Sequence, residues 1–230
     1  MRGAATKISA GSNDPPRYFR SSALTALRET PARVVVLASG TGSLLQSLIA
    51  ATEAQDYPAR IIAVGVDRDC DAVRRADEAG IPHVRIALKH FADRSAWDHA
   101  LTDAVLGFEP DLVVTAGFMK ILGARFLESF AGRIVNTHPA LLPSFPGAHA
   151  VRDALDHGVK LTGSTVHLVD SGVDTGPILA QEAVPVLDDD DEAALHERIK
   201  TVERRLLVDV IAAVAATGIT SDGRKAQIIR

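Results

Sequence analysis

The sequence is poor in the features that mark several classes of protein. A single cysteine, Cys70, occurs among 230 residues, which excludes an internal disulfide and a cysteine-based metal cage and favours a reducing compartment. The longest apolar stretch, residues 206–216, is too short to cross a bilayer and contains Asp209. The formal net charge is −4, without the basic excess typical of nucleic-acid binding. We therefore expect a cytoplasmic protein with no membrane and no nucleic-acid partner.

The chain does contain ample material for a hydrophobic core. Apolar residues make up 47% of it and charged residues 23%, as in ordinary globular domains. Residues 1–30 lack both apolar periodicity and the apolar segment of a secretory signal. They are predicted to be a disordered N-terminal extension, with a transit peptide as the open alternative. Residues 31–220 are predicted to form one domain and residues 221–230 a C-terminal tail.

Apolar β-branched runs alternate with amphipathic segments along most of the chain. Parallel strands joined through helices require right-handed crossovers, so this alternation predicts the α/β class. We expect a single Rossmann-like domain with a mainly parallel twisted sheet and helices on both faces. The strands are predicted at 33–38, 60–66, 83–87, 111–116 and 133–136, and the helices at 43–54, 70–79 with Asp69 as the cap, and 93–108 with Asp93 as the cap.

The rhythm changes in the C-terminal part. Longer strands at 158–170 and 176–186 are separated by a Gly/Asp turn, which predicts an antiparallel pair at one side of the sheet. The acidic run 188–192 then opens a long helix over about 190–216. Acidic residues at a helix N-terminus are explained by capping and the helix dipole, so this run indicates no function.

A glycine-rich turn follows the first strand. The sequence "SGTGSLL" (39–45) leads directly into a helix, where the backbone amides of Gly42, Ser43 and Leu44 would point at an anion. This arrangement favours phosphate binding. A plain strand-to-helix turn is the alternative.

Other nucleotide-binding patterns fit this turn less well. A dinucleotide fingerprint would have a third glycine where Leu45 stands, although Asp67 lies where a ribose-binding acid would follow the second strand. A Walker motif would need Gly-Lys-Ser/Thr, which is missing here.

The loop "NTHPALLPSFPG" (136–147) follows the fifth strand. Its prolines stiffen the backbone, and Asn136 and His138 precede them. Two hydrogen-bond donors side by side are what a tetrahedral oxyanion requires. Downstream, "VDTGP" supplies Asp174 in a glycine-bounded loop, and a carboxylate near an imidazole favours its charged form. A structural histidine and a turn aspartate are the alternatives.

Two other chemistries fit the same residues less well. A metal site could draw on His138, His149, His167 and Asp174, but their spacings match no compact ligand motif. A Ser-His-Asp site would need a G-x-S-x-G elbow, and the sequence has none. Direct transfer between two bound substrates, without a metal, is the simpler chemistry.

Four segments together resemble one enzyme family. "VVVLASGTGSLLQSLI", "VVTAGFMKIL", "NTHPALLPSFPG" and "GSTVHLVDSGVDTGPIL" are similar to the folate-dependent phosphoribosylglycinamide formyltransferases, in order and with matching spacing from about residue 33 to 215. The Asn-x-His-Pro loop with a downstream Asp-x-Gly-Pro marks the wider formyltransferase superfamily. The turn at 39–44 selects the purine enzyme within it.

The resemblance implies formyl transfer from 10-formyltetrahydrofolate, as co-substrate, to the amine of phosphoribosylglycinamide in purine biosynthesis. It implies small-molecule substrates and a monomer or homodimer. The catalytic positions match Asn136, His138 and Asp174. The substrate-binding positions match the phosphate cradle Gly42, Ser43 and Leu44 and the ribose-binding Glu203. The cofactor-binding positions match Arg94, Met119, Lys120, Ile121, Leu122, Asn136, Asp170, Ser171, Gly172, Val173 and Asp174.

Two positions depart from the family pattern. Leu44 stands where Asn is common, so only its backbone amide can bind phosphate, and Lys120 stands where Arg is frequent. Related families fit less well, because methionyl-tRNA formyltransferases carry a second, basic domain and formyltetrahydrofolate deformylases begin with a regulatory domain. Another folate-dependent formyltransferase or hydrolase, or a non-catalytic nucleotide-binding module, remains the alternative.

Overall fold

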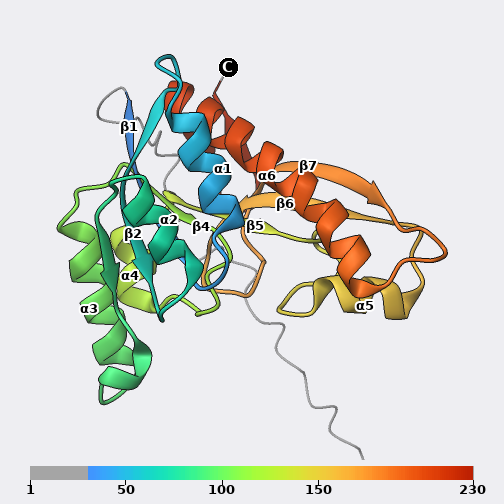
Figure 1. Ribbon diagram of the computed structural model, residues 1–230, viewed down its shortest axis with the longest axis horizontal. Helices are drawn as coiled ribbons and strands as arrows, with labels where there is room; N and C mark the ends of the chain where they lie inside the picture. Colours follow the sequence, from blue (N-terminus) through green and yellow to red (C-terminus); the bar gives the residue numbers. More distant parts are fainter. Residues whose placement is uncertain (1–30, 230) are drawn as a thin grey trace, which may run out of the picture.

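The computed structural model describes residues 31–229, so the predicted N-terminal extension lies outside the described residues. These residues build a seven-stranded sheet with the strand order β3-β2-β1-β4-β5-β6-β7, and a separate two-stranded hairpin, β8-β9. Helices lie in front of the sheet and behind it (Figure 1). The α/β class expected from the sequence is confirmed. The first five strands are parallel, β6 is antiparallel to β5, and β7 is antiparallel to β6.

The elements follow one another in chain order as strand and helix. They are β1 (Ala32–Ala38), α1 (Ser43–Thr52), β2 (Ala59–Val66), α2 (Asp71–Glu78), β3 (His83–Arg85), the 3-10 helix η2 (Leu88–His90), α3 (Arg94–Leu106), β4 (Leu112–Thr115), α4 (Ala124–Ser129), β5 (Ile134–His138), α5 (Ala150–His157), β6 (Leu161–Leu168), β7 (Ile178–Pro185), α6 (Glu192–Thr217), β8 (Ile219–Ser221) and β9 (Ala226–Ile228).

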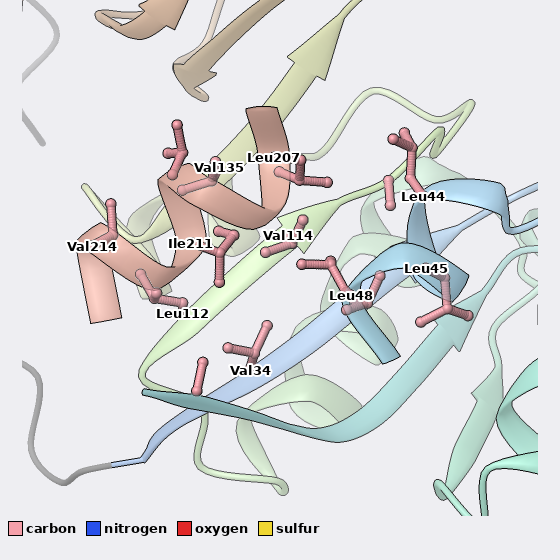
Figure 2. Close-up of a cluster of buried hydrophobic side chains, with 14 of the residues drawn as sticks. Val34, Leu44, Leu45, Leu48, Leu112, Val114, Val135, Leu207, Ile211 and Val214 are labelled. Carbon is pink, nitrogen blue, oxygen red and sulfur yellow. The ribbon is translucent and has the colours of Figure 1, made fainter. Parts of the chain in front are cut away.

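The α1/α6 face of the sheet carries the larger core. Leu44, Leu45 and Leu48 of α1 pack with Leu207 and Ile211 of α6 over the strands (Figure 2). Most strand residues beneath this layer are alanine or valine, with Leu112 and Leu168 as exceptions, as suits a sheet buried on both sides. Helix α2 joins the same layer. Helices α1 and α6 therefore pack side by side on this face.

The α3/α4 face carries a second core. Trp97 of α3 is fully buried, and its indole nitrogen donates to the carbonyl of Ile86 at 2.9 Å. Phe126 and Phe130, in and just after α4, pack on each other with ring centres 4.7 Å apart. Because both faces are covered, loops at the carboxyl ends of the parallel strands are the accessible polar edge of the sheet.

Several local expectations need correction. Asp69 does not cap α2, because Cys70 is the N-cap residue and Asp69 instead pairs with Arg85. The third strand stops at Arg85, short of the expected residue 87. By contrast, the side chain of Asp93 caps α3 by accepting from the amide of Ala96, as expected.

Several elements were not expected from the sequence, among them α4, α5 and the hairpin β8-β9. Helices α4 and α5 are short, with 6 and 8 residues, and too brief for a clear periodic signal. The segment named as a C-terminal tail instead contributes β9, which pairs with β8 in a hairpin. Ile228 of β9 packs against the α1/α6 core.

Over residues 31–229, no helix combines the length and the apolar character needed to cross a bilayer.

Candidate active site

Polar side chains gather at the carboxyl end of β5. Along this strand, side chains alternate between the two faces of the sheet. Ile134 belongs to the α3/α4 core and Val135 to the α1/α6 core. By the same alternation Asn136 and His138 share one side of the strand, while Thr137 faces α6. The two predicted oxyanion donors are thus neighbours on one side.

His138 is held by both of its ring nitrogens. Nδ1 lies 3.3 Å from Oδ2 of Asp174, and Nε2 lies 2.8 Å from the carbonyl oxygen of Phe145. A carbonyl can only accept, so Nε2 carries a hydrogen. Only the protonated imidazolium satisfies both contacts at once, because a bare Nδ1 would face the carboxylate. The structure therefore brings His138 and Asp174 together, as the sequence predicted.

Burial disfavours the charged, imidazolium form of His138. Desolvation lowers the pKa of His138 and outweighs the raising effects of Asp174 and the Phe145 carbonyl. Sequence reasoning considered only the carboxylate, which would have raised the pKa. The carboxyl of Asp174 behaves differently. Burial would raise its pKa, but His167, the amide of Gly147 and His138 together hold it below its ordinary value. A permanent carboxylate thus faces an imidazole that readily gives up its proton.

Asp174 is fixed by backbone geometry. It follows β6 in a loop and has φ of 54°, a left-handed conformation that is strained for a side chain with a Cβ. Its Oδ2 accepts from the amide of Gly147 at 2.8 Å, which ties the loop after β6 to the proline-rich loop. In the same loop, Asp170 accepts from the amide of Gly172 and from the hydroxyl of Thr175.

A chain of hydrogen bonds orients Asn136. The hydroxyl of Thr115, at the end of β4, donates to Oδ1 of Asn136 at 2.6 Å. Nδ2 of Asn136 lies 3.0 Å from Nε2 of His167, and Nδ1 of His167 donates to the carbonyl of Leu168 at 2.9 Å. One amide hydrogen of Asn136 is used in this chain, so the second remains free to donate elsewhere.

His167 is a residue of the candidate site whose position sequence reasoning missed. It entered only as one of four ligands of an alternative metal site. In the structure it is 2% exposed and lies beside both Asn136 and Asp174, with Nε2 3.6 Å from Oδ1 of Asp174. The signal that could have found it is its place on a strand pairing with β5, where it stands opposite Asn136. Within residues 31–229, no group of three or more His, Cys, Asp or Glu side chains could hold a metal ion.

The predicted phosphate loop presents backbone to the edge of the sheet. Gly42 is the N-cap of α1 with φ of 68°, and no side chain caps the helix. The side chain of Leu44 is 9% exposed and packs into the α1/α6 core. At position 44, therefore, the backbone amide and not the side chain is available to a ligand.

Gly42 is also confined by its neighbours. A Cβ at this position would lie 3.0 Å from Cα of Ala72 and 3.1 Å from Cδ of Arg75. The guanidinium of Arg75 in turn donates to the carbonyl of Thr41 at 2.8 Å. Helix α2 therefore supports the turn from below, and glycine is required at position 42 for both conformation and space.

Glu203 lies on α6, on the other side of β5 from Asn136 and His138. It is 4% exposed and accepts from the hydroxyl of Thr137 at 3.1 Å. Burial raises its pKa to about 7, which the Thr137 hydrogen bond only partly offsets. The predicted phosphate and ribose groups therefore belong to the same face, the one built by α1 and α6.

In the loop after β4, successive side chains point alternately into the protein and out to solvent. Met119 and Ile121 are 66% and 64% exposed, while Leu122 is 7% exposed. The ammonium of Lys120 turns inward and pairs with Asp67 at 2.9 Å, so it is engaged within the protein. Asp67, which follows the second strand where a ribose-binding acid would lie, is thus an ion-pair partner in this structure.

Arg94 stands at the start of α3, next to the same loop. Its guanidinium donates to the carbonyl of Ile121 at 2.7 Å and lies 5.6 Å from the ring centre of Trp97. Val173, on the loop before Asp174, is 50% exposed. The exposed apolar side chains at this edge therefore come from the two loops that were predicted to bind the folate.

Comparison with known proteins decides the family. The family model described as "Formyl transferase" matches residues 32–211. The chain belongs to the formyl transferase family. A curated phosphoribosylglycinamide formyltransferase of Mycobacterium tuberculosis is 62% identical over 200 residues, covering 87% of this chain and 93% of that protein. The enzyme class expected from the sequence, a formyltransferase, is confirmed.

Solved structures place this enzyme in the same fold. Glycinamide ribonucleotide transformylase 1 of Symbiobacterium toebii superimposes with a TM-score of 0.84 at 39% identity, over 86% of this chain and 94% of that chain. A formyltetrahydrofolate deformylase of Pseudomonas syringae pv. tomato superimposes with a TM-score of 0.81 at 26% identity, over 90% of this chain and 67% of that chain. The fold is therefore shared by a transferase and a hydrolase, and the site must distinguish them.

Proposed function

We propose that the enzyme transfers a formyl group from 10-formyltetrahydrofolate to the amine of phosphoribosylglycinamide, in purine biosynthesis. The observation that carries the proposal is the convergence of Asn136, His138 and Asp174 at the carboxyl end of β5, with His138 3.3 Å from the Asp174 carboxylate. The name of the Mycobacterium tuberculosis relative supports the choice of acceptor.

The arrangement of subsites supports two ligands that meet at β5. On the α1/α6 face, the amides of Ser43 and Leu44 bind the phosphate and Glu203 binds the ribose hydroxyls. On the α3/α4 face, Met119 and Ile121 present 66% and 64% exposed apolar side chains to the pteridine end of the folate. The amine and the formyl carbon then meet beside Asn136 and His138.

Several further residues are proposed to complete the donor subsite. Arg94 attracts the carboxylates of the folate, because a guanidinium binds carboxylates through paired donors. The backbone of Leu122 and the loop made of Asp170, Ser171, Gly172, Val173 and Asp174 form the other wall. Lys120 contributes through its backbone, because its ammonium is engaged by Asp67.

The chemistry is direct attack of the amine on the formyl carbon. The C=O double bond becomes a C–O⁻ single bond as the new C–N bond forms, which gives a tetrahedral intermediate. The free amide hydrogen of Asn136 and the Nε2 hydrogen of His138 stabilise the negative oxygen. For this, Nε2 exchanges the Phe145 carbonyl, 2.8 Å away in the structure, for the substrate oxygen.

Proton transfer completes the reaction. The amine loses a proton on becoming an amide, and the folate nitrogen gains one as its bond to the formyl carbon breaks. His138 relays this proton, because its lowered pKa makes the imidazolium a ready donor. Asp174, whose pKa is also lowered, stays ionised and holds the imidazole in place.

Hydrolysis of the formyl donor is the competing function, favoured by the superposition with the Pseudomonas syringae deformylase. The two are separated by one experiment. Purified full-length enzyme is given the formyl donor with phosphoribosylglycinamide, with glycinamide alone, or with no amine. We expect rapid formyl transfer only with the ribonucleotide. Release of formate at the same rate in all three reactions would contradict the proposal and establish a hydrolase.

A further inference from the structure

A buried carboxylate that no predicted ligand touches lies directly after β2. Asp67 is 5% exposed. The ammonium of Lys120 and the guanidinium of Arg68 each lie 2.9 Å from its Oδ2, and the hydroxyl of Ser39 hydrogen-bonds it as well. Burial would raise its pKa, but these partners outweigh burial and lower the pKa to about 2. Asp67 is therefore a permanent anion with two cations.

The contacts of Asp67 join segments that are far apart in the sequence. Ser39 begins the predicted phosphate loop, and its Oγ accepts from the amide of Met119 at 2.8 Å. Its own amide donates to the carbonyl of Gly117 at 3.2 Å. The loop after β4 is thus tied to the end of β1 by backbone and to the end of β2 by Lys120.

The inward-pointing side chains of Lys120 and Leu122 determine which side chains of this loop face solvent. In an extended segment, alternate side chains point in opposite directions. With Lys120 and Leu122 turned inward, Met119 and Ile121 are turned to solvent at 66% and 64% exposure. The side chain of Lys120 is only 22% exposed, in spite of its charge. Its pairing with Asp67 compensates for that burial.

We propose that Lys120 is a positioning residue, whose ion pair with Asp67 holds residues 117–122 so that Met119 and Ile121 form an apolar platform for the formyl donor. Ser39 connects this platform to the phosphate loop, so that both subsites share one support. The inference rests on the proposed function, because it takes the folate as the ligand of the platform.

Arg68 cannot replace Lys120 in this role. It is adjacent to Asp67 in the chain and its side chain is 51% exposed, so its pairing stays within one segment. Losing Arg68 removes a cation from the same carboxylate without releasing the loop after β4. Arg68 is therefore the matched control, equal in charge and in distance to Asp67 but different in what it ties together.

The test is steady-state kinetics of the full-length enzyme, with both substrates varied. For Lys120→Met we expect the KM of the formyl donor to rise about tenfold and kcat to fall less than threefold, because the platform is misplaced and the catalytic residues are not. Lys120→Arg, which can still reach the carboxylate, restores the KM. Arg68→Met stays within about twofold of the parent.

A double-mutant cycle completes the test. Asp67→Asn raises the KM of the donor as Lys120→Met does, and the double variant is no worse than either single variant. Should Asp67→Asn fail to fold, the comparison of Lys120→Met, Lys120→Arg and Arg68→Met decides alone. A lowered melting temperature with an unchanged KM in Lys120→Met overturns the inference.

Two further outcomes separate the positioning role of Lys120 from direct binding by Lys120 and from failure of the proposed function. A raised KM in Lys120→Met beside a normal KM in Asp67→Asn also overturns the inference, because Lys120 would then bind the donor directly. Parent enzyme that transfers no formyl group would instead refute the proposed function, whereas active parent enzyme with unaffected variants refutes only the positioning role of Lys120.

Discussion

The two faces of the sheet offer their ligands different kinds of surface. On the α1/α6 side, the predicted phosphate site is bare backbone, with Gly42 at φ of 68° and Leu44 buried in the core. On the α3/α4 side, the predicted donor site is exposed apolar side chains supported by a buried ion pair. Between them, at β5, lie titratable groups. In the proposed function, ligand binding depends mainly on the two faces and chemistry on the residues at β5, so changes on the faces should affect mainly KM and changes at β5 mainly kcat.

The largest effect is expected at the junction of the two faces. His138→Ala removes the only titratable group whose Nε2 hydrogen can reach the substrate oxygen in the proposed mechanism. We expect kcat to fall about 10²–10⁴-fold with little change in either KM, the range for loss of an acid or an oxyanion donor. Single-turnover formyl transfer measures it.

The control for that variant is a histidine nearby in the chain. His149 is exposed and precedes α5, and its side chain makes no capping hydrogen bond. His149→Ala should keep normal kcat and KM. A normal kcat for His138→Ala with a lowered melting temperature would mean that His138 is a structural residue.

On the α1/α6 side, backbone conformation should control binding. In Gly42→Ala the new Cβ lies 3.0 Å from Cα of Ala72, and the residue must keep a left-handed conformation. We expect the KM of the ribonucleotide to rise roughly tenfold, with the KM of the folate and kcat nearly unchanged.

A second glycine separates strain from contact. Gly80 has φ of 65°, and a Cβ there meets nothing within 4 Å. Gly80→Ala should cost about 1–2 kcal/mol of stability through its conformation alone and leave both KM values unchanged. If Gly42→Ala raises the KM values of both substrates equally, the two faces do not act as separate subsites.

A smaller effect is expected from the pH dependence of ribose binding. Burial raises the pKa of Glu203 to about 7, so the carboxylate that accepts ribose hydroxyls is lost as the pH falls through 7. Titration of one such group predicts a rise in the ribonucleotide KM of roughly fivefold between pH 7 and pH 6. Glu203→Gln removes this component while leaving the titration of the substrate phosphate, so the difference between the two profiles is the measurement.

The smallest effect concerns the support of Asn136. Thr115→Val removes the hydroxyl that donates to Oδ1 of Asn136 at 2.6 Å and keeps the shape of the side chain. Nδ2 of Asn136 stays beside His167, so the amide is loosened rather than released, and kcat should fall by about threefold with unchanged KM values. A change confined to KM would show that Asn136 binds substrate without acting on the transition state.

Much of the fold could be predicted because it is written in local patterns. The runs at β1, β2, β4 and β5 are apolar and β-branched, and the capping residue Asp93 precedes its helix directly. The same applies to Asn136 and His138, since both sit where one strand ends. The predictions that failed concern elements with short or ambiguous sequence signals, such as the 6-residue helix α4 and the cap of α2.

Apart from the pairing of His138 with Asp174, the partners of the site residues could not be predicted, because they come from distant segments. His167 stands 31 residues from Asn136, and Ser39 stands 80 residues from Met119. No periodicity records such contacts. The lowering of the His138 pKa could not be predicted for the same reason. The sequence contains the neighbouring Asp174 but does not show the burial that outweighs it.

The central claim is that Asp174 acts as a charge on His138, and the pH–rate profile of Asp174→Asn tests it most directly. Asp174 raises the pKa of His138 against the lowering effect of burial, so removing its charge lowers that pKa further. Because the lowered pKa of His138 lies below that of the substrate amine, the acidic limb of the profile breaks at the pKa of His138. Lowering this pKa further moves the acidic limb to lower pH and lowers the plateau of the profile.

The basic limb, set by a substrate amine with an ordinary pKa of about 7.7–8.0, should stay in place. Because the two groups act together, whole profiles of kcat are compared rather than single pKa values. The account predicts a large fall in kcat with an acidic limb displaced to lower pH. A near-normal kcat with the acidic limb in place would contradict it and leave Asp174 as a turn residue.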